Sequence, residues 1–254
     1  TAAGQTYVID RATGETIERI ETIRNGRVAR LTPDNSTLLV LSGTTLAGYY
    51  TPTGKQLFQL QVGGNAMVVD PAGSAVYVGG NRDDRITEVS LSSDKITRTF
   101  PVAGSGDLTW AEGKLFSADM KTGIMSIIDP DSGGIKRLQS TEVDPHFNYH
   151  SIGQANAGFM QIAAAPQLHQ VYAAGFSGHI LKFSSADDSY LGEVAVKATT
   201  DGPEKLSGLA VLKGGRVALT TIENLHETVE VDMKTGEVIR RFPGIASNRW
   251  VVGR

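Results

Sequence analysis

Histidine is the residue type in this chain that is best suited to metal chemistry. His146 and His150 are separated by three residues in STEVDPHFNYHSIGQANAG, His179 follows GFSG, and His226 follows ENL. Imidazole is the commonest metal ligand in proteins, so these histidines could converge on Cu, Zn or Fe, with Asp119 or Asp144 as oxygen ligands. The alternative is that they are polar loop residues held by ordinary hydrogen bonds.

Charged side chains elsewhere could bind an anion or a partner. GGNRDDR places Arg82 and Asp83 in one short loop, where the Arg82 guanidinium could hold an anionic ligand or a partner's carboxylate. Asp107 follows the glycine-rich VAGSG, and Asp119 follows the apolar KLFSA. We expect these four residues to line one ligand-binding mouth, although a solvated turn is the simpler interpretation of GGNRDDR.

The composition excludes several classes of function. The chain has 254 residues, a net charge of -3 and no cysteine, which excludes disulfides, thiolate metal sites, cysteine nucleophiles and covalent haem attachment. Lysine and arginine are scattered, which argues against nucleic acid as a partner. No apolar run approaches the roughly 20 residues that a transmembrane segment needs.

The elements that would position these residues repeat along the chain. A strand–turn–strand pattern recurs in IDRATGET, YTPTGKQL, LSSDKIT, DPDSGGIK, SADDSYLG and DMKTGEVI. The first turns, at Gly14, Gly54, Asp94 and Gly133, lie 40, 40 and 39 residues apart. A second hairpin alternates with the first, with turns such as TPDNS and DPAGS, so one period holds four short strands.

A four-stranded sheet has two apolar faces and must stack on copies of itself, which predicts an all-β propeller. We expect the innermost strands (A) to be RVARL, NAMVV, GDLTW, GFMQIA, LSGLAV and RWVVG, followed by strands B, C and D of each blade. The D-to-A and B-to-C connections then share one mouth. His146 and His150 fall on a D-to-A connection, and His179 and His226 fall on B-to-C connections of that mouth.

The strand count predicts how the propeller closes. The chain begins at a C strand and ends at an A strand, so the two termini should share one blade of a single domain over residues 1–254. Six A strands and six C strands accompany only five B strands. We therefore predict six blades, or seven if about one more repeat lies outside the sequence.

The repeats resemble the YVTN family of bacterial β-propellers. The resemblance rests on Tyr7-Val8-Ile9-Asp10 with Ala12-Thr13-Gly14, on Leu31-Thr32-Pro33-Asp34, on Val69-Asp70-Pro71 with Gly73, on Tyr77-Val78 and on Ile127-Ile128-Asp129. It implies a relationship to the β subunits of quinoprotein amine dehydrogenases and to periplasmic or surface proteins. It implies no catalytic residue.

Three functions remain open. The first is an exported binding or scaffold protein whose mouth holds a protein partner, a ligand or a transition metal, and the sequence favours this non-catalytic role. The second is a subunit of a redox complex whose quinone or cytochrome haem sits on a partner chain. The third is a metal-dependent lactonase-type hydrolase that uses Asn65, Asp107 and Asn248 at the starts of inner strands.

The sequence gives one indication of location. TAAGQTYVID has neither the basic start nor the apolar stretch of a signal peptide. We therefore expect either a cytoplasmic protein or an exported one whose leader has been removed. The lack of cysteine favours the periplasm or the cell exterior.

Overall fold

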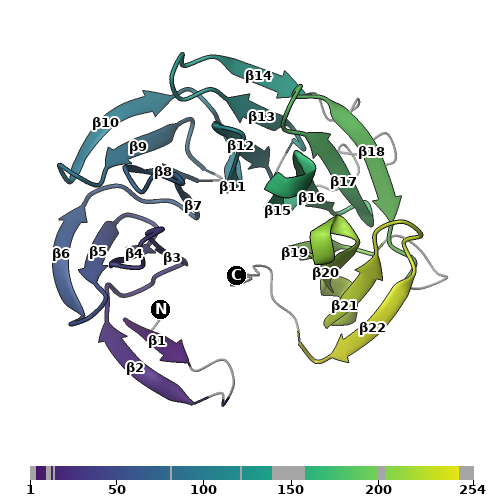
Figure 1. Ribbon diagram of the computed structural model, residues 1–254, viewed down its shortest axis with the longest axis horizontal. Coiled ribbons are helices and arrows are strands. Elements are labelled where there is room, and N and C mark those ends of the chain that lie inside the picture. Colours follow the sequence, from purple (N-terminus) through teal and green to yellow (C-terminus); the bar gives the residue numbers. More distant parts are fainter. Residues whose placement is uncertain are drawn as a thin grey trace. The chain divides into compact units, whose positions relative to one another are not determined.

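A computed structural model describes residues 4–9, 13, 15–80, 82–120, 122–138, 158–198 and 204–245. The chain divides into two compact units, Thr1–Ser105 and Gly106–Arg254. Both consist of antiparallel sheets in which strands that follow each other in the chain are hydrogen-bonded neighbours (Figure 1). The helices of the described part are single 3-10 turns, and none is long and apolar enough to cross a membrane.

The first unit contains a two-stranded sheet followed by two four-stranded sheets. In chain order, its strands are β1 (Gln5–Ile9), β2 (Thr16–Glu21), β3 (Val28–Leu31), β4 (Thr37–Leu41), β5 (Leu46–Tyr50), β6 (Lys55–Leu60), β7 (Ala66–Val69), β8 (Ala75–Gly79), β9 (Ile86–Ser90) and β10 (Lys95–Phe100).

The second unit contains three four-stranded sheets. Its strands are β11 (Ser105–Ala111), β12 (Lys114–Asp119), β13 (Met125–Ile128), β14 (Ile135–Leu138), β15 (Phe159–Ala165), β16 (Gln170–Gly175), β17 (His179–Ser184), β18 (Tyr190–Ala195), β19 (Leu206–Leu212), β20 (Val217–Ile222), β21 (Glu227–Asp232) and β22 (Val238–Pro243). The 3-10 turns are η1 (Pro166–Leu168), η2 (Lys213–Gly215) and η3 (Glu223–Leu225).

The predicted four-strand repeat is confirmed. The five four-stranded sheets begin at β3, β7, β11, β15 and β19, which are the expected A strands, and each continues through B, C and D in chain order. The expected C and D strands near the N-terminus, β1 and β2, form the two-stranded sheet. RWVVG lies outside the described residues, so the shared closing blade, the final blade count and the single domain stay predictions.

Strand β4 shows why these strands are apolar on both faces. Leu38 and Val40 belong to a core cluster with Ile20 of the preceding sheet. Leu39 and Leu41 point the other way and belong to a cluster with residues of the β7–β10 sheet. Because side chains alternate between the faces of a strand, one run of four apolar residues fills two interfaces.

The second unit repeats this arrangement at β16. Val171 and Ala173 belong to a cluster shared with the β11–β14 sheet, where Phe159 is fully buried. Tyr172 and Ala174 belong to the cluster shared with the β19–β22 sheet. Burial on both faces accounts for the apolar runs that the sequence shows in B strands.

Five of the six described outer strands share a β-bulge near their first residues, and β14 pairs with β13 without one. In β2, β6, β10, β18 and β22 the pairing register skips one residue of the outer strand, respectively Ile17, Leu57, Thr97, Leu191 and Ile239. The four aliphatic residues of this set are between 46% and 66% exposed. A bulge twists an edge strand and disrupts its ladder, which discourages pairing with another edge.

Two inner-strand side chains accept hydrogen bonds from the neighbouring sheet in the described part of the second unit. The Asp107 carboxylate on β11 accepts a hydrogen bond from the Ile162 N–H on β15 at 2.9 Å. The Gln161 side-chain oxygen on β15 accepts one from the Leu209 N–H on β19 at 2.8 Å. Asp107 and Gln161 are the third residues of their strands, so the same device occurs at two successive interfaces.

Candidate functional site

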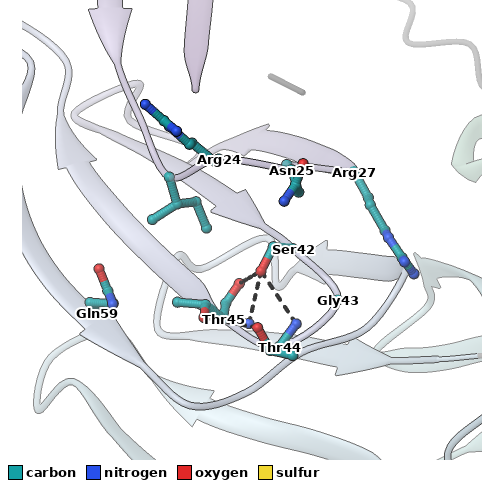
Figure 2. A pocket seen from close by; sticks show the side chains of 10 residues that line it. Arg24, Asn25, Arg27, Ser42, Gly43, Thr44, Thr45 and Gln59 are labelled. Atoms are coloured by element: carbon teal, nitrogen blue, oxygen red, sulfur yellow. Dashed lines mark hydrogen bonds between the residues drawn. The ribbon is translucent and has the colours of Figure 1, made fainter. Parts of the chain in front are cut away.

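A cavity of about 700 Å³ lies in the first unit, on connections of the two kinds that the sequence predicts to share a mouth (Figure 2). It is formed by the D-to-A connection between β2 and β3 and by the B-to-C connection between β4 and β5. Its lining residues are Ile23, Arg24, Asn25, Gly26, Arg27, Ser42, Gly43, Thr44, Thr45 and Gln59. The lining therefore combines hydroxyl and amide groups with two positive charges and contains no carboxylate.

The β4–β5 connection is held by the Ser42 hydroxyl. Its oxygen accepts hydrogen bonds from the N–H groups of Thr44 at 3.3 Å and Thr45 at 3.0 Å, and it lies 3.3 Å from the Thr45 carbonyl oxygen, to which it donates. The Ser42 carbonyl oxygen accepts from the Gly64 N–H at 3.0 Å. These bonds fix the connection as a tight turn at the floor of the cavity.

The β2–β3 connection is anchored at both ends. The Ile23 N–H donates to the Tyr49 hydroxyl at 2.7 Å, and the Arg27 N–H donates to the Leu41 carbonyl oxygen at 2.7 Å. Burial raises the pKa of Tyr49, which keeps this hydroxyl neutral at physiological pH. Asn25 adopts a left-handed φ of 56°, which suits an Asn-Gly turn.

Arg24 and Arg27 give the cavity its charge. Both side chains are exposed, and neither forms an ion pair or side-chain hydrogen bond with another described residue. Figure 2 shows Arg27 extending toward Gly43 and Arg24 extending in the other direction. A Cβ placed on Gly43 would lie 3.3 Å from Nη2 of Arg27, so the guanidinium rests close to the backbone there.

The predicted residues Arg82 and Asp83 lie on the β8–β9 connection of the first unit, and both side chains are exposed. The Asp83 N–H donates to the Gly80 carbonyl oxygen at 3.2 Å, and the Asp83 carbonyl oxygen accepts from the Gly104 N–H at 3.0 Å. The backbone of Asp83 therefore orders this loop. Neither residue lines the Arg24–Arg27 cavity.

The predicted aspartates of the second unit are already engaged. Asp107 is 3% exposed and accepts from the Ile162 N–H, as described above. Asp119 accepts from the hydroxyl of Thr122 at 2.6 Å and from its N–H at 3.2 Å, within the β12–β13 turn. Both carboxylates have a structural role, and their role in ligand binding stays a prediction.

Two of the four predicted metal ligands fall in the described residues. His179 begins β17, with Nδ1 donating to the Ser177 carbonyl oxygen at 3.0 Å and Nε2 at 3.8 Å from a carboxylate oxygen of Glu193. His226 directly follows η3 in the β20–β21 connection, with an exposed side chain and a φ of 51°. His226 therefore lies on a B-to-C connection as expected, whereas His179 is the first residue of the C strand that follows such a connection.

The predicted pair His146 and His150 lies outside the described residues, as does Asp144. Within the part of the chain that the structure describes, no three His, Asp or Glu side chains gather in a way that could hold a metal ion. The Cu, Zn or Fe site therefore stays a prediction that depends on the segment carrying His146 and His150.

Sequence reasoning missed the Arg24–Arg27 cavity. The signal was present in IRNGRV, where an Asn-Gly turn is flanked by two arginines on a D-to-A connection. Composition drew attention to histidines and to GGNRDDR instead. The facing SGTT turn, which completes the cavity, is 15 residues or more away in the chain and carries no signal of its own.

Comparisons with solved structures support the architecture. The chain is similar to hydrazine synthase from Kuenenia stuttgartiensis, with a TM-score of 0.76 and 11% identity over 97% of this chain and 82% of that one. It is equally similar to the Cps50 (Swd1) β-propeller domain of Myceliophteria thermophila, with a TM-score of 0.76 and 12% identity over 96% and 81%. The fold is that of a β-propeller.

A more distant likeness, to U3-55K, has a TM-score of 0.65 and 12% identity and covers 86% of this chain and 64% of that one. No protein-family model matches the chain, and no curated protein sequence matches it. At these identities the likenesses show the propeller fold alone. The YVTN resemblance therefore stays a prediction, as does any activity.

Proposed function

We propose that the chain is an exported binding module of the β-propeller type that uses the loops of one mouth to hold a protein partner. The observation that carries this proposal is the Arg24–Arg27 cavity, which lies on a D-to-A and a B-to-C connection. Strands buried on both faces hold such loops rigidly, and rigid scaffolds commonly carry their binding residues on loops. The exported location rests on the absence of cysteine.

The test begins with the intact protein immobilised and exposed to an extract of its source organism. Retained proteins are then purified and rebound to the free chain, and hydrogen exchange locates the contact. We expect a purified partner to slow the exchange of amides in residues 22–27 and 42–45. The proposal is overturned if no purified partner protects these segments.

A variant carrying Lys55→Gln serves as the control. Lys55 is an exposed residue of the same blade, at the other end of β6 from Gln59, and it does not line the cavity. The variant therefore changes the net charge without changing the mouth. It should bind the purified partner as the wild type does.

Two alternatives keep their own tests. A redox-complex subunit requires that the native protein copurify with a cytochrome or quinone-bearing chain, and the same retention experiment with haem detection checks it. The transition-metal prediction requires bound Cu, Zn or Fe in the native protein. We expect that metal to be lost in His146→Ala and His150→Ala, and a metal-free native protein would remove both the metal site and the lactonase-type hydrolase.

A further inference from the structure

We infer that the Arg24–Arg27 cavity is a carboxylate-binding site, with Arg27 as the principal ligand-binding side chain and Arg24 as a second cation at the rim. This inference rests on the proposed binding function and names the chemistry that the mouth recognises. Four features of the cavity support it, namely its charge, the position of Arg27, its backbone donors and its size.

The charge is unbalanced. Among the described residues, several arginines on outer strands are paired with glutamates, as in Arg19–Glu21, Arg98–Glu88 and Arg241–Glu227. Arg24 and Arg27 form no such pair within the same part of the chain, and no acidic side chain lines their cavity. Two arginines that line one polar cavity without an acidic partner there favour an anion.

The backbone of Arg27 is held in place, and its guanidinium is still available to bind a ligand. Its backbone is fixed by the bond from its N–H to the Leu41 carbonyl oxygen. Its guanidinium lies beside Gly43, where the absence of a side chain leaves room for the planar group against the turn. In Figure 2 Asn25 lies between the two arginines, above the Ser42 turn, where its amide could bond the same ligand.

The backbone donors favour a carboxylate over a phosphate. Phosphate sites commonly use a nest of free backbone N–H groups. Here the N–H groups of Thr44 and Thr45 donate to the Ser42 hydroxyl, and the N–H of Gly64 donates to the Ser42 carbonyl oxygen. The donors that remain are side chains, among them the two guanidinium groups, which can each pair bidentately with the two oxygens of a carboxylate.

The size of the cavity leaves room for a ligand larger than a single carboxylate. Its volume of about 700 Å³ is within the range of roughly 300–1,000 Å³ that is typical of small-ligand sites. Polar groups of Asn25, Thr44 and Gln59 could bond to amide or hydroxyl groups of the same ligand. The chemistry therefore fits an acidic peptide segment of a partner or a free polycarboxylic acid.

The experiment measures binding of two probes, an acetylated tetraglutamate peptide and citrate, to the full chain by calorimetry at low salt. We expect Arg27→Gln to weaken the better probe about tenfold, because a bidentate charged hydrogen-bond pair is lost. Arg24→Gln should weaken it about threefold. Arg27→Lys, which keeps the charge without the fork, should fall between wild type and Arg27→Gln.

The control variant is again Lys55→Gln, which should leave both affinities unchanged. The inference is wrong if neither probe binds, or if Lys55→Gln weakens binding as much as Arg27→Gln does. It is also wrong if inorganic phosphate binds as tightly as the better carboxylate with the same dependence on Arg27. Tighter binding of the peptide identifies a partner segment as the source, and tighter binding of citrate identifies a free acid.

The inference and the proposed function can fail separately. A protein partner that protects residues 22–27 and 42–45 from exchange, in a chain that binds neither probe, would leave the function standing and remove the carboxylate site. Citrate binding that depends on Arg27, without any protein partner, would support the carboxylate site and remove the proposed function.

Discussion

At the scale of the residue, aspartates close the turns between strands. Asp34 accepts hydrogen bonds from the Thr32 hydroxyl at 2.6 Å and from the Ser36 N–H at 3.0 Å. Asp129 and Asp232 accept from backbone N–H groups of their own turns in the same way. These hydrogen bonds favour the ionised form of each aspartate, because the carboxylate oxygens act as the acceptors.

The Asp34 turn predicts a dependence of stability on acid. The Thr32 hydroxyl, followed by the Ser36 N–H, lowers the pKa of Asp34 from 3.8 to about 2. Because the folded-state pKa lies below the unfolded one, the stabilisation is complete above about pH 3.8 and is lost as the pH falls to about 2. Urea unfolding at a series of pH values should show stability falling through this window.

A substitution tests the cause of the low pKa. Thr32→Val removes the hydroxyl, so an NMR titration should show the pKa of Asp34 rising toward its ordinary value. Thr53→Val, in the β5–β6 turn, is the control and should leave the Asp34 titration as it is. An unchanged pKa in Thr32→Val would show that the hydroxyl bond is not the main cause.

At the scale of the element, the backbone of one connection can lie in close contact with the backbone of another. Gly63, between β6 and β7, faces the turn that forms the floor of the cavity. A Cβ at this position would lie 2.1 Å from the carbonyl oxygen of Gly43 and 2.3 Å from Cα of Thr44. Only glycine fits there without moving the backbone of the β4–β5 connection.

Gly63→Ala should therefore destabilise the chain by about 1–3 kcal/mol, as overpacking typically does. The matched variant is Gly43→Ala, in which the nearest atom is the flexible end of Arg27 at 3.3 Å. That variant should lose much less stability, since the guanidinium can move aside. Urea midpoints measure both, and equal losses would contradict the backbone explanation.

At the scale of the molecule, side chains from inner strands hold neighbouring sheets together within the second unit. Asp107 and Gln161 accept hydrogen bonds from the N–H groups of Ile162 and Leu209. Ile162 and Leu209 are only 4% and 1% exposed. Without Asp107 and Gln161, these buried N–H groups would have lost their hydrogen-bond acceptors.

Gln161→Ala should cost about 1–3 kcal/mol of unfolding free energy, because it leaves the Leu209 N–H unsatisfied. Asp107→Ala should have a similar cost, and Asp107→Asn a smaller one, since the amide oxygen can still accept the bond. Gln56→Ala, an exposed outer-strand change in the first unit, is the control. Denaturant unfolding checks the series, and losses no larger than that of Gln56→Ala would refute this role.

The outer strands carry exposed apolar residues that side-chain alternation does not predict. Alternation predicts that exposed positions of β22 are polar, yet Ile239 is 54% exposed. The reason is the bulge, which inserts one unpaired residue and moves the following side chains to the opposite face. A sequence shows the apolar residue, but only the pairing register shows that it is the inserted one.

The sequence by itself determined the four-strand repeat and the order of strands A to D within the described four-stranded sheets. These follow from local rules, namely side-chain alternation and turn chemistry, which act over a few residues. Only the tertiary structure decided that Arg27 lies against Gly43 and that Asp107 meets Ile162. Such contacts join segments from about 15 to more than 50 residues apart, and they depend on how sheets pack, which no local pattern encodes.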